Sequence, residues 1–189
     1  MTRIIAGQAR GRRLAVPPGN GTRPTSDRAR EGLFSALDSL LHGLGGLRVI
    51  DGYAGSGAVG LEALSRGAAA ALLIESDRGA ADVVRANLRT LAVPGGRVLA
   101  ERVERVAARP CPDAPYDLLF LDPPYALEAK TLSAQIEDFA GHGWLGPDAV
   151  VCVERASRDA EWIWPEGFDS LRVRAYGEGT LWYGHRREQ

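Results

Sequence analysis

Cysteine, histidine and lysine are scarce in this sequence of 189 residues, which has two cysteines, three histidines and a single lysine, Lys130. Cys111 and Cys152 lie far apart, and the histidines are scattered rather than grouped. Zinc sites and disulfide frameworks need several such residues at short, regular spacings. We therefore expect free thiols in a reducing compartment, no bound metal and no catalytic histidine.

Long hydrophobic runs are also absent, although 45% of the residues are hydrophobic. No stretch approaches the roughly 18 apolar residues of a membrane-spanning helix. The first residues lead directly to Arg3, Arg10 and Arg12, without the apolar centre of a signal peptide. These absences predict a cytoplasmic protein with no membrane partner, and the length suits one domain with or without a small appendage.

Acidic residues are nearly missing from the amino-terminal segment, although the whole chain has a net charge of −1. The first 30 residues contain one acid, Asp27, against seven arginines: Arg3, Arg10, Arg12, Arg13, Arg23, Arg28 and Arg30. Such an excess on one segment is typical of a surface that binds nucleic-acid phosphates. A solvated amino terminus in an arginine-biased composition is the alternative that remains open.

Residues 117–125 carry the most informative motif, Asp-Leu-Leu-Phe-Leu-Asp-Pro-Pro-Tyr. The apolar run at 118–121 predicts a buried central strand of a parallel sheet. Two consecutive prolines cannot continue a strand, because each lacks an N–H and has a fixed φ. The chain must therefore leave the sheet at Asp122, at the carboxyl edge of the strand, where ligands bind in open α/β sheets.

This turn suits chemistry on an exocyclic amine. The Asp122 carboxylate and the Pro123 carbonyl can accept the two amine hydrogens, and the Tyr125 ring can stack on the base. Holding both hydrogens localises the nitrogen lone pair, so that the nitrogen can attack an electrophilic methyl group. The alternative is a rigid connector whose tyrosine is merely packed.

A second motif lies between a predicted strand at 47–51 and a predicted helix at 61–66. Gly55, Gly57 and Gly60 form the G-x-G-x-x-G pattern, which lets the backbone approach a ligand at a helix amino terminus. The next predicted strand, 70–74, ends at Glu75, an acid that can bind ribose hydroxyls. The pattern alone fits NAD, S-adenosylmethionine or a glycine turn without ligand. Hydride transfer has no use for the Asp-Pro-Pro-Tyr turn, so we expect S-adenosylmethionine.

Strand and helix patterns alternate through the rest of the chain. We expect a small hairpin from 3–7 and 13–16, a loop at 17–21, and a helix that starts at Ser26 or Asp27 and ends before Gly43. Further expected elements are helices at 77–91, 103–108 and 128–140, strands at 97–100, 118–121 and 149–154, and a hairpin of 168–175 with 180–184. Together they predict a doubly wound α/β sheet of Rossmann type, mostly parallel, with a carboxy-terminal antiparallel hairpin. The one expected boundary, near Leu47, separates an RNA-contacting extension (1–46) from the core (47–189).

These motifs resemble known proteins. Residues 51–67 with Asp122-Pro-Pro-Tyr125 resemble the class I S-adenosylmethionine-dependent methyltransferases. More narrowly, residues 3–7, 11–14 and 23–28, with Glu31 and Phe34, resemble the RsmD family, which methylates the exocyclic N2 of a guanine in the 16S ribosomal RNA of the small subunit. The likeness runs nearly from end to end and includes residues 143–145 and 181–183.

The resemblance implies roles for individual residues. The methionine half of the cofactor would be lined by Asp51, Tyr53, Gly55, Ser56 and Gly57. The ribose would be held by Glu75, beside Ser76, and the acceptor site would consist of Asp122, Pro123, Pro124 and Tyr125, with Asp122 also facing the cofactor. Closure over cofactor and RNA would involve Arg23, Thr25 and Arg28.

Two positions depart from the family pattern. Gly52 stands where the family usually has a bulky apolar residue. Arg102 stands where an acidic residue usually meets the adenine amine, so we expect a main-chain contact near Arg102 or Val103 instead.

The predicted reaction is direct methyl transfer without a metal, by a monomer, onto 16S ribosomal RNA within a small-subunit assembly intermediate. Because guanine N2 takes part in base pairing, the target base must be unpaired or extruded. Methylation of adenine N6 in DNA or RNA, or of a glutamine amide, is a second possibility. A non-catalytic RNA-binding assembly factor is a third.

Overall fold

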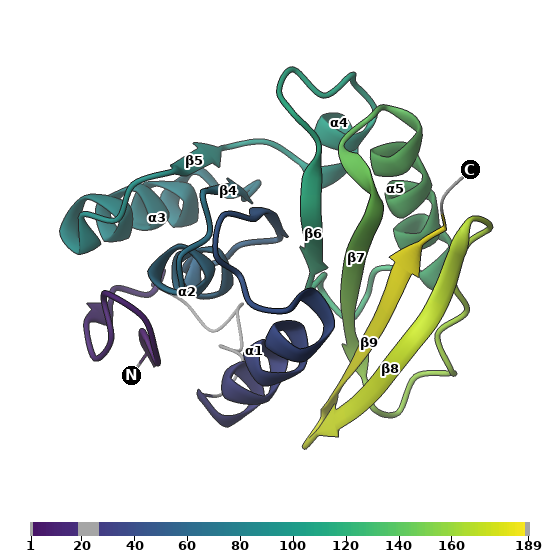
Figure 1. The fold of residues 1–189 in the computed structure, drawn as a ribbon, viewed down its shortest axis with the longest axis horizontal. Helices are drawn as coiled ribbons and strands as arrows, with labels where there is room; N and C mark the ends of the chain where they lie inside the picture. Colours follow the sequence, from purple (N-terminus) through teal and green to yellow (C-terminus); the bar gives the residue numbers. More distant parts are fainter. Residues whose placement is uncertain (1, 19–26, 188–189) are drawn as a thin grey trace.

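The computed structural model describes residues 2–18 and 27–187. Within these ranges the main sheet has seven strands in the order β5-β4-β3-β6-β7-β9-β8 (Figure 1). The first five strands of this order are parallel, and β9 pairs antiparallel with both β7 and β8. The strands are β3 (Arg48–Gly52), β4 (Ala70–Ile74), β5 (Gly96–Leu99), β6 (Tyr116–Leu121), β7 (Leu145–Ala156), β8 (Phe168–Tyr176) and β9 (Gly179–Arg186).

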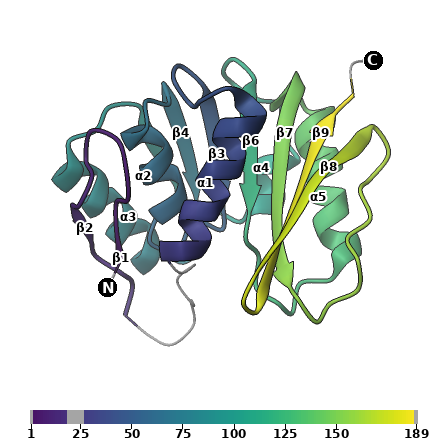
Figure 2. The same ribbon diagram turned by 60° about the horizontal axis from the view of Figure 1, so that its bottom comes forward.

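Helices cover both faces of the sheet, because alternate strand residues point to opposite sides (Figure 2). Leu118 and Phe120 of β6 pack on one side with α1 (Asp27–Leu41) and α2 (Ala58–Ser65), and α3 (Arg78–Leu91) continues this layer over β4. Leu119 and Leu121 pack on the other side with α4 (Val103–Ala107) and α5 (Ala129–Gly141). The predicted doubly wound α/β fold with its closing hairpin is confirmed.

Most predicted elements are found within a few residues of their expected bounds. The helix predicted from 61 begins at Ala58, since Gly57 in the left-handed region forms its amino-terminal cap and Gly60 is accepted inside its first turn. The strand predicted from 149 begins at Leu145, because Leu145 pairs with Tyr116 across a register shift. The amino-terminal hairpin is shorter than expected, with only β1 (Thr2–Arg3) paired to β2 (Arg13–Leu14).

The amino-terminal segment is fastened to the core through Glu62, which sequence reasoning missed. The Glu62 side chain is fully buried and accepts hydrogen bonds from the backbone N–H groups of Ile5 (2.7 Å) and Ala6 (2.9 Å). Helix α1 likewise shares one apolar cluster with the sheet and with α2. The boundary expected near Leu47, between an extension (1–46) and the core (47–189), stays a prediction, as does the RNA-contacting role of the extension.

None of the helices in the described ranges is both long enough and apolar enough to cross a membrane.

Candidate active site

The two motifs lie at the same edge of the sheet. Strands β3 and β6 are parallel neighbours, with Asp51 paired to Phe120 and Gly52 to Leu121. The chain after β3 enters the glycine loop and α2 on one face, and the chain after β6 enters the Asp122–Tyr125 turn and α5 on the other face. This arrangement is a topological switch point, the place where ligands bind in such sheets.

The glycine loop is held tightly against its neighbours. Tyr53, Gly55 and Gly57 all have positive φ values, of 65°, 57° and 80°. A side chain at Gly57 would place its Cβ 2.9 Å from Val84 Cγ1, so only glycine fits this position without displacement. The Tyr53 hydroxyl donates to Gln135 Oε1 of α5 at 2.8 Å, which links the loop to the helix that follows the second motif.

Asp51 is buried beneath this loop. Its carboxylate accepts a hydrogen bond of 2.8 Å from the N–H of Gly60, in the first turn of α2. Burial raises the pKa of the Asp51 carboxyl to about 7, an effect that the bond from Gly60 opposes and the charge of Glu75 reinforces. A cation in front of Asp51 and Glu75 would stabilise both carboxylates.

Glu75 lies at the carboxyl end of β4 and connects two loops. One carboxylate oxygen accepts from the N–H of Gly55 at 2.9 Å, and the other accepts from the N–H of Asp77 at 2.8 Å. Ser76 beside it is exposed, and the next strand end carries Arg102, the exposed cap of α4, and Val103, which is buried. The expected ribose and adenine residues therefore follow two adjacent strands, β4 and β5.

Asn87 of α3, another residue that sequence reasoning missed, ties the amino-terminal segment to the glycine loop. Its buried side-chain amide donates to the carbonyls of Ala15 (2.9 Å) and Ser56 (3.0 Å) and accepts from the N–H of Ala15 (2.9 Å). An asparagine in an amphipathic helix carries no sequence signal for this contact.

The Asp122–Tyr125 turn is half-buried at its start and open at its end. Pro123 is buried, Asp122 is partly buried, and Tyr125 is 42% exposed, so the tyrosine is not a core residue. Two bonds fix the chain beyond it: the N–H of Leu127 donates to the Pro124 carbonyl at 2.9 Å, and the Arg155 guanidinium donates to the Leu127 carbonyl at 2.9 Å. The strand end before this turn also accounts for the glycine at position 52, because a Cβ there would lie 2.6 Å from Leu121 Cδ2.

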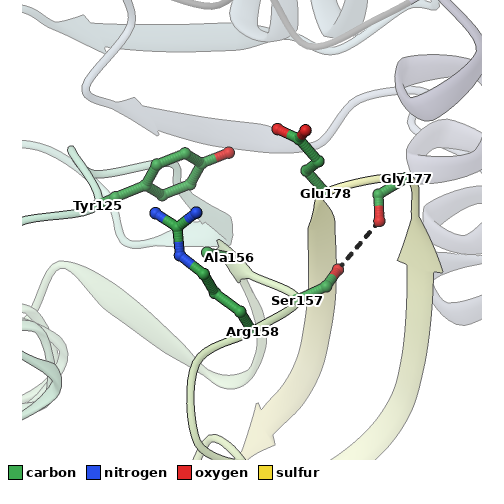
Figure 3. Close-up of a pocket in the computed structure, with 6 residues that line it drawn as sticks. All are labelled: Tyr125, Ala156, Ser157, Arg158, Gly177 and Glu178. Atoms are coloured by element: carbon green, nitrogen blue, oxygen red, sulfur yellow. Dashed lines mark hydrogen bonds between the residues drawn. The ribbon is translucent and has the colours of Figure 1, made fainter.

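A pocket of about 370 Å³ opens beside Tyr125. Its other lining residues come from the end of β7 and the β8–β9 turn, and they are Ala156, Ser157, Arg158, Gly177 and Glu178 (Figure 3). The Arg158 guanidinium carbon lies 5.9 Å from the centroid of the Tyr125 ring. Sequence reasoning missed this half of the site, because these residues form no motif and meet only through strand pairing.

The arginines predicted to bind RNA fall into three groups. Those on the surface of the described chain are Arg3, Arg10, Arg12, Arg13 and Arg28. Arg30 has a fully buried side chain that bonds to the Arg3 carbonyl and to Asp27, so the prediction that Arg30 contacts RNA is wrong. Arginine at 30 lies on the inward face of α1, which the charge count alone could not reveal. Arg23 and Thr25 lie outside the described residues.

The described residues contain no group of three or more His, Cys, Asp or Glu side chains placed to hold a metal ion. A reaction without a metal stays a prediction.

The chain is similar to known proteins over almost its whole length. A family model described as "Conserved hypothetical protein 95" matches residues 2–185. The chain is 41% identical to ribosomal RNA small subunit methyltransferase D of Escherichia coli over 152 residues, which cover 80% of this chain and 73% of that protein. It is 36% identical to the protein of the same name from Haemophilus influenzae, covering 93% and 89% of the two chains.

Solved structures agree with this relationship. The Escherichia coli protein yhhF, named as a candidate methyltransferase, superposes with a TM-score of 0.86 at 36% identity, covering 99% of this chain and 98% of the other. A magnesium protoporphyrin IX methyltransferase from Synechocystis with bound SAM has a TM-score of 0.63 at 16% identity, covering 89% and 86% of the two chains, and so shows only the shared fold. The extent of the family match and the two methyltransferase D relatives show that this chain belongs to the RsmD family of ribosomal RNA methyltransferases.

Proposed function

We propose that this protein transfers a methyl group from S-adenosylmethionine to the exocyclic N2 of a guanine in 16S ribosomal RNA. The observation that carries the proposal is the pairing of β3 with β6, which brings the glycine loop and the Asp122–Tyr125 turn to one edge. The relatives named as small-subunit methyltransferases support ribosomal RNA as the substrate.

The residues around the glycine loop suit a cationic cofactor. Asp51 and Glu75 place two carboxylates at adjacent strand ends, and the pKa of Asp51 is raised by its burial and by the charge of Glu75. A pyrophosphate, as in NAD, would meet this negative charge, whereas the positively charged methionine half of S-adenosylmethionine would neutralise it. We assign that half to Asp51, Tyr53, Gly55, Ser56 and Gly57, the ribose to Glu75 and Ser76, and the adenine edge to the main chain at Arg102 and Val103.

When bound, S-adenosylmethionine supplies a methyl group on a sulfonium, which leaves as a neutral thioether. The Asp122 carboxylate and the Pro123 carbonyl accept the two hydrogens of the guanine amine. With the methyl donor held there, the amine nitrogen would take the methyl group, and Asp122 would pass the proton that the amine loses to solvent. Pro123 and Pro124 keep the turn stiff, so the acceptors are positioned before the base arrives.

Tyr125 would stack on the extruded base. Its residue is 42% exposed, and base–aromatic stacking contributes about 1–3 kcal/mol, which offsets part of the cost of unpairing the base. We further propose that a monomer acts in the cytoplasm on a small-subunit assembly intermediate, with the amino-terminal arginines on RNA phosphates.

The decisive experiment incubates the protein with labelled methyl donor and under-modified small-subunit particles, followed by digestion and identification of the labelled nucleoside. N2-methylguanosine is the expected product. Detection of N6-methyladenosine or of a labelled glutamine instead would show that the acceptor is adenine or a glutamine amide and not guanine N2. No incorporation, together with no cofactor uptake in calorimetry, would indicate a binding protein without turnover.

Asp122→Ala is expected to bind the cofactor normally but to lose methyl transfer by at least about a hundredfold, since one acceptor of the developing charge is removed. Single-turnover rates and calorimetric titration of the cofactor measure the two effects separately. Asp148→Ala, which removes an exposed carboxylate near the other end of β7, is the matched control. A normal transfer rate in the Asp122 variant would remove this residue from the mechanism.

A further inference from the structure

The pocket beside Tyr125 has a rigid frame on the side away from the glycine loop. Ser157, just after β7, donates its N–H to the Glu178 carbonyl at 2.7 Å, and its hydroxyl lies 3.3 Å from the Gly177 carbonyl and 2.9 Å from Thr180 Oγ1. These contacts fasten the β8–β9 turn to the end of β7. The two charged residues of the pocket, Arg158 and Glu178, therefore project from backbones that are fixed relative to each other.

The same frame extends to the proposed acceptor turn. Arg155 is only 8% exposed, and its guanidinium donates to the Leu127 carbonyl (2.9 Å) and forms an ion pair with Asp159 (3.1 Å). Arg155 thus connects the end of β7 to the chain that follows Tyr125. The Tyr125 ring, the Arg158 guanidinium and the Glu178 carboxylate consequently face one space of defined shape (Figure 3).

The size and charge of this space suit a nucleobase. Its volume of about 370 Å³ lies at the lower end of the roughly 300–1,000 Å³ of small-ligand pockets. Ala156 contributes only a methyl group to the wall, so the pocket stays open. A phosphate would bind Arg158 but would be repelled by Glu178. A base edge that carries both acceptors and donors has groups that can pair with Arg158 and with Glu178.

Guanine presents the matching edge. Arginine pairs with the acceptors O6 and N7 of guanine, and a carboxylate accepts from a donor such as N1–H. Adenine has a donor amine in place of O6 and an unprotonated acceptor at N1, so it would face Arg158 and Glu178 with the wrong polarity.

We infer that Arg158 and Glu178 select guanine as the acceptor base, with Arg158 donating to O6 and Glu178 accepting from N1–H while Tyr125 stacks on the ring. This inference rests on the proposed function, because Asp122 and Pro123 must hold the N2 amine of the same base. Arg158 and Glu178 are specificity residues, and neither takes part in proton or methyl transfer.

The test compares two acceptor bases that carry the same 2-amino group. Small-subunit particles are reconstituted with ribosomal RNA that has either guanine or 2-aminopurine at the methylated position. 2-Aminopurine lacks O6 and has an acceptor at N1. Wild-type protein, Arg158→Gln, Arg158→Lys and Glu178→Gln are assayed for single-turnover methylation, and 2-aminopurine fluorescence reports binding where transfer is too slow to follow.

On guanine, Arg158→Gln and Glu178→Gln are each expected to lower kcat/KM by about tenfold or more. On 2-aminopurine, Arg158→Gln is expected to change kcat/KM little, because the base has no O6. Glu178→Gln is expected to keep or raise kcat/KM on this base, because the glutamine amide can donate to N1. Arg158→Lys recovers part of the rate on guanine. Equal losses on the two bases, which a purely structural role would give, or no loss on guanine, would overturn the inference.

Matched controls remove the same charges from exposed positions outside the pocket. Arg174→Gln lies on β8, and Glu166→Gln lies before β8. Both are expected to behave as wild type. The wild-type reaction on guanine particles tests the proposed function by itself: if it forms no N2-methylguanosine, the proposed function fails, whereas normal formation with unchanged variants rejects only the guanine pocket.

Discussion

Asp51 shows how one residue responds to burial beside a second carboxylate. The carboxylate is 2% exposed, lies near Glu75 and has a pKa raised from 3.8 to about 7. Since the folded pKa is the higher one, the folded protein holds a proton that the unfolded chain has released between these two values. The stability contributed by the site is therefore present below about pH 4 and is lost as the pH rises through about 7.

Replacing Asp51 by asparagine keeps an acceptor for Gly60 and removes the titration. Relative to Asp51→Asn, the wild-type protein is expected to lose on the order of 3 kcal/mol of unfolding free energy between pH 5 and pH 8. Urea unfolding of both proteins across this range measures the difference. A constant difference would mean that Asp51 does not titrate there.

Cofactor binding near pH 7 should release protons, which calorimetry in two buffers of different ionisation enthalpy detects.

Gly52 and Leu121 are neighbours whose side-chain sizes depend on each other. Leu121 reaches across to the space where a side chain at Gly52 would lie, with its Cδ2 only 2.6 Å from the position of a Cβ. Both residues are buried directly before the two motifs. Leu121 therefore occupies the space that a side chain at position 52 would need.

Gly52→Ala alone is expected to destabilise the protein by about 1–3 kcal/mol through overpacking. Adding Leu121→Val, which shortens the opposing side chain, should recover much of this loss, and the double-mutant cycle should give a coupling of about 1–2 kcal/mol. Chemical denaturation provides the free energies. Gly45→Ala, where a Cβ meets nothing within 4 Å, serves as the control. Additive effects of Gly52→Ala and Leu121→Val would show that Leu121 is not what excludes a side chain at position 52.

At the scale of elements, α2 connects the amino-terminal segment to the sheet. Glu62 accepts from Ile5 and Ala6 and pairs with Arg66 Nε at 2.9 Å, while Ser65 accepts from the N–H of Ala9 at 3.0 Å. The helix is apolar on nearly every side because it is covered by the sheet, α1 and this segment. The buried carboxylate of Glu62 is stabilised in this apolar helix because the amino-terminal segment and Arg66 supply hydrogen-bond donors.

Glu62→Ala is expected to release residues 2–18 from α2 and to cost about 3–5 kcal/mol, since buried partners lose their acceptor. Hydrogen exchange should show that the amides of Ile5 and Ala6 lose protection, while the amides of β6 stay protected. Glu104→Ala, an exposed carboxylate on α4, controls for loss of charge. Protection of Ile5 and Ala6 that survives the change would show that other contacts hold the segment.

At the scale of the whole molecule, charge is distributed unevenly around a chain of net charge −1. The arginine-rich hairpin (β1 and β2) lies beside α2 and α3, at the opposite end of the molecule from β8 and β9 (Figure 1). The switch point between β3 and β6 lies between these regions. A substrate that contacts both the hairpin and the pocket must span the molecule, which a folded RNA can do.

Arg10→Ala combined with Arg13→Ala is expected to weaken binding to under-modified particles and to reduce the slope of log K against log salt by about two, close to one for each phosphate that the protein no longer neutralises. Cofactor affinity should stay unchanged. Filter binding at several salt concentrations gives the slope. Arg174→Ala, on β8, removes a positive charge from the distant side as the control. An unchanged slope would place the RNA away from the hairpin.

Local patterns in the sequence were enough to predict the alternation of strands and helices, the two loop motifs and their order along the chain. Each rests on local rules: apolar periodicity, the missing N–H of Pro123 and Pro124, and the backbone freedom of Gly55 and Gly57. These rules act over a few residues, so the features could be predicted without knowledge of the fold.

Contacts between residues far apart in the sequence became known only from the folded structure. Four features depend on strand order and register: the inward direction of Arg30, the burial of Glu62, the packing of Leu121 against Gly52, and the approach of Arg158 and Glu178 to Tyr125. The physical reason is that burial and long-range contact are properties of packed neighbours, and a charged residue looks the same in a sequence whether its partner is water or another element of the fold.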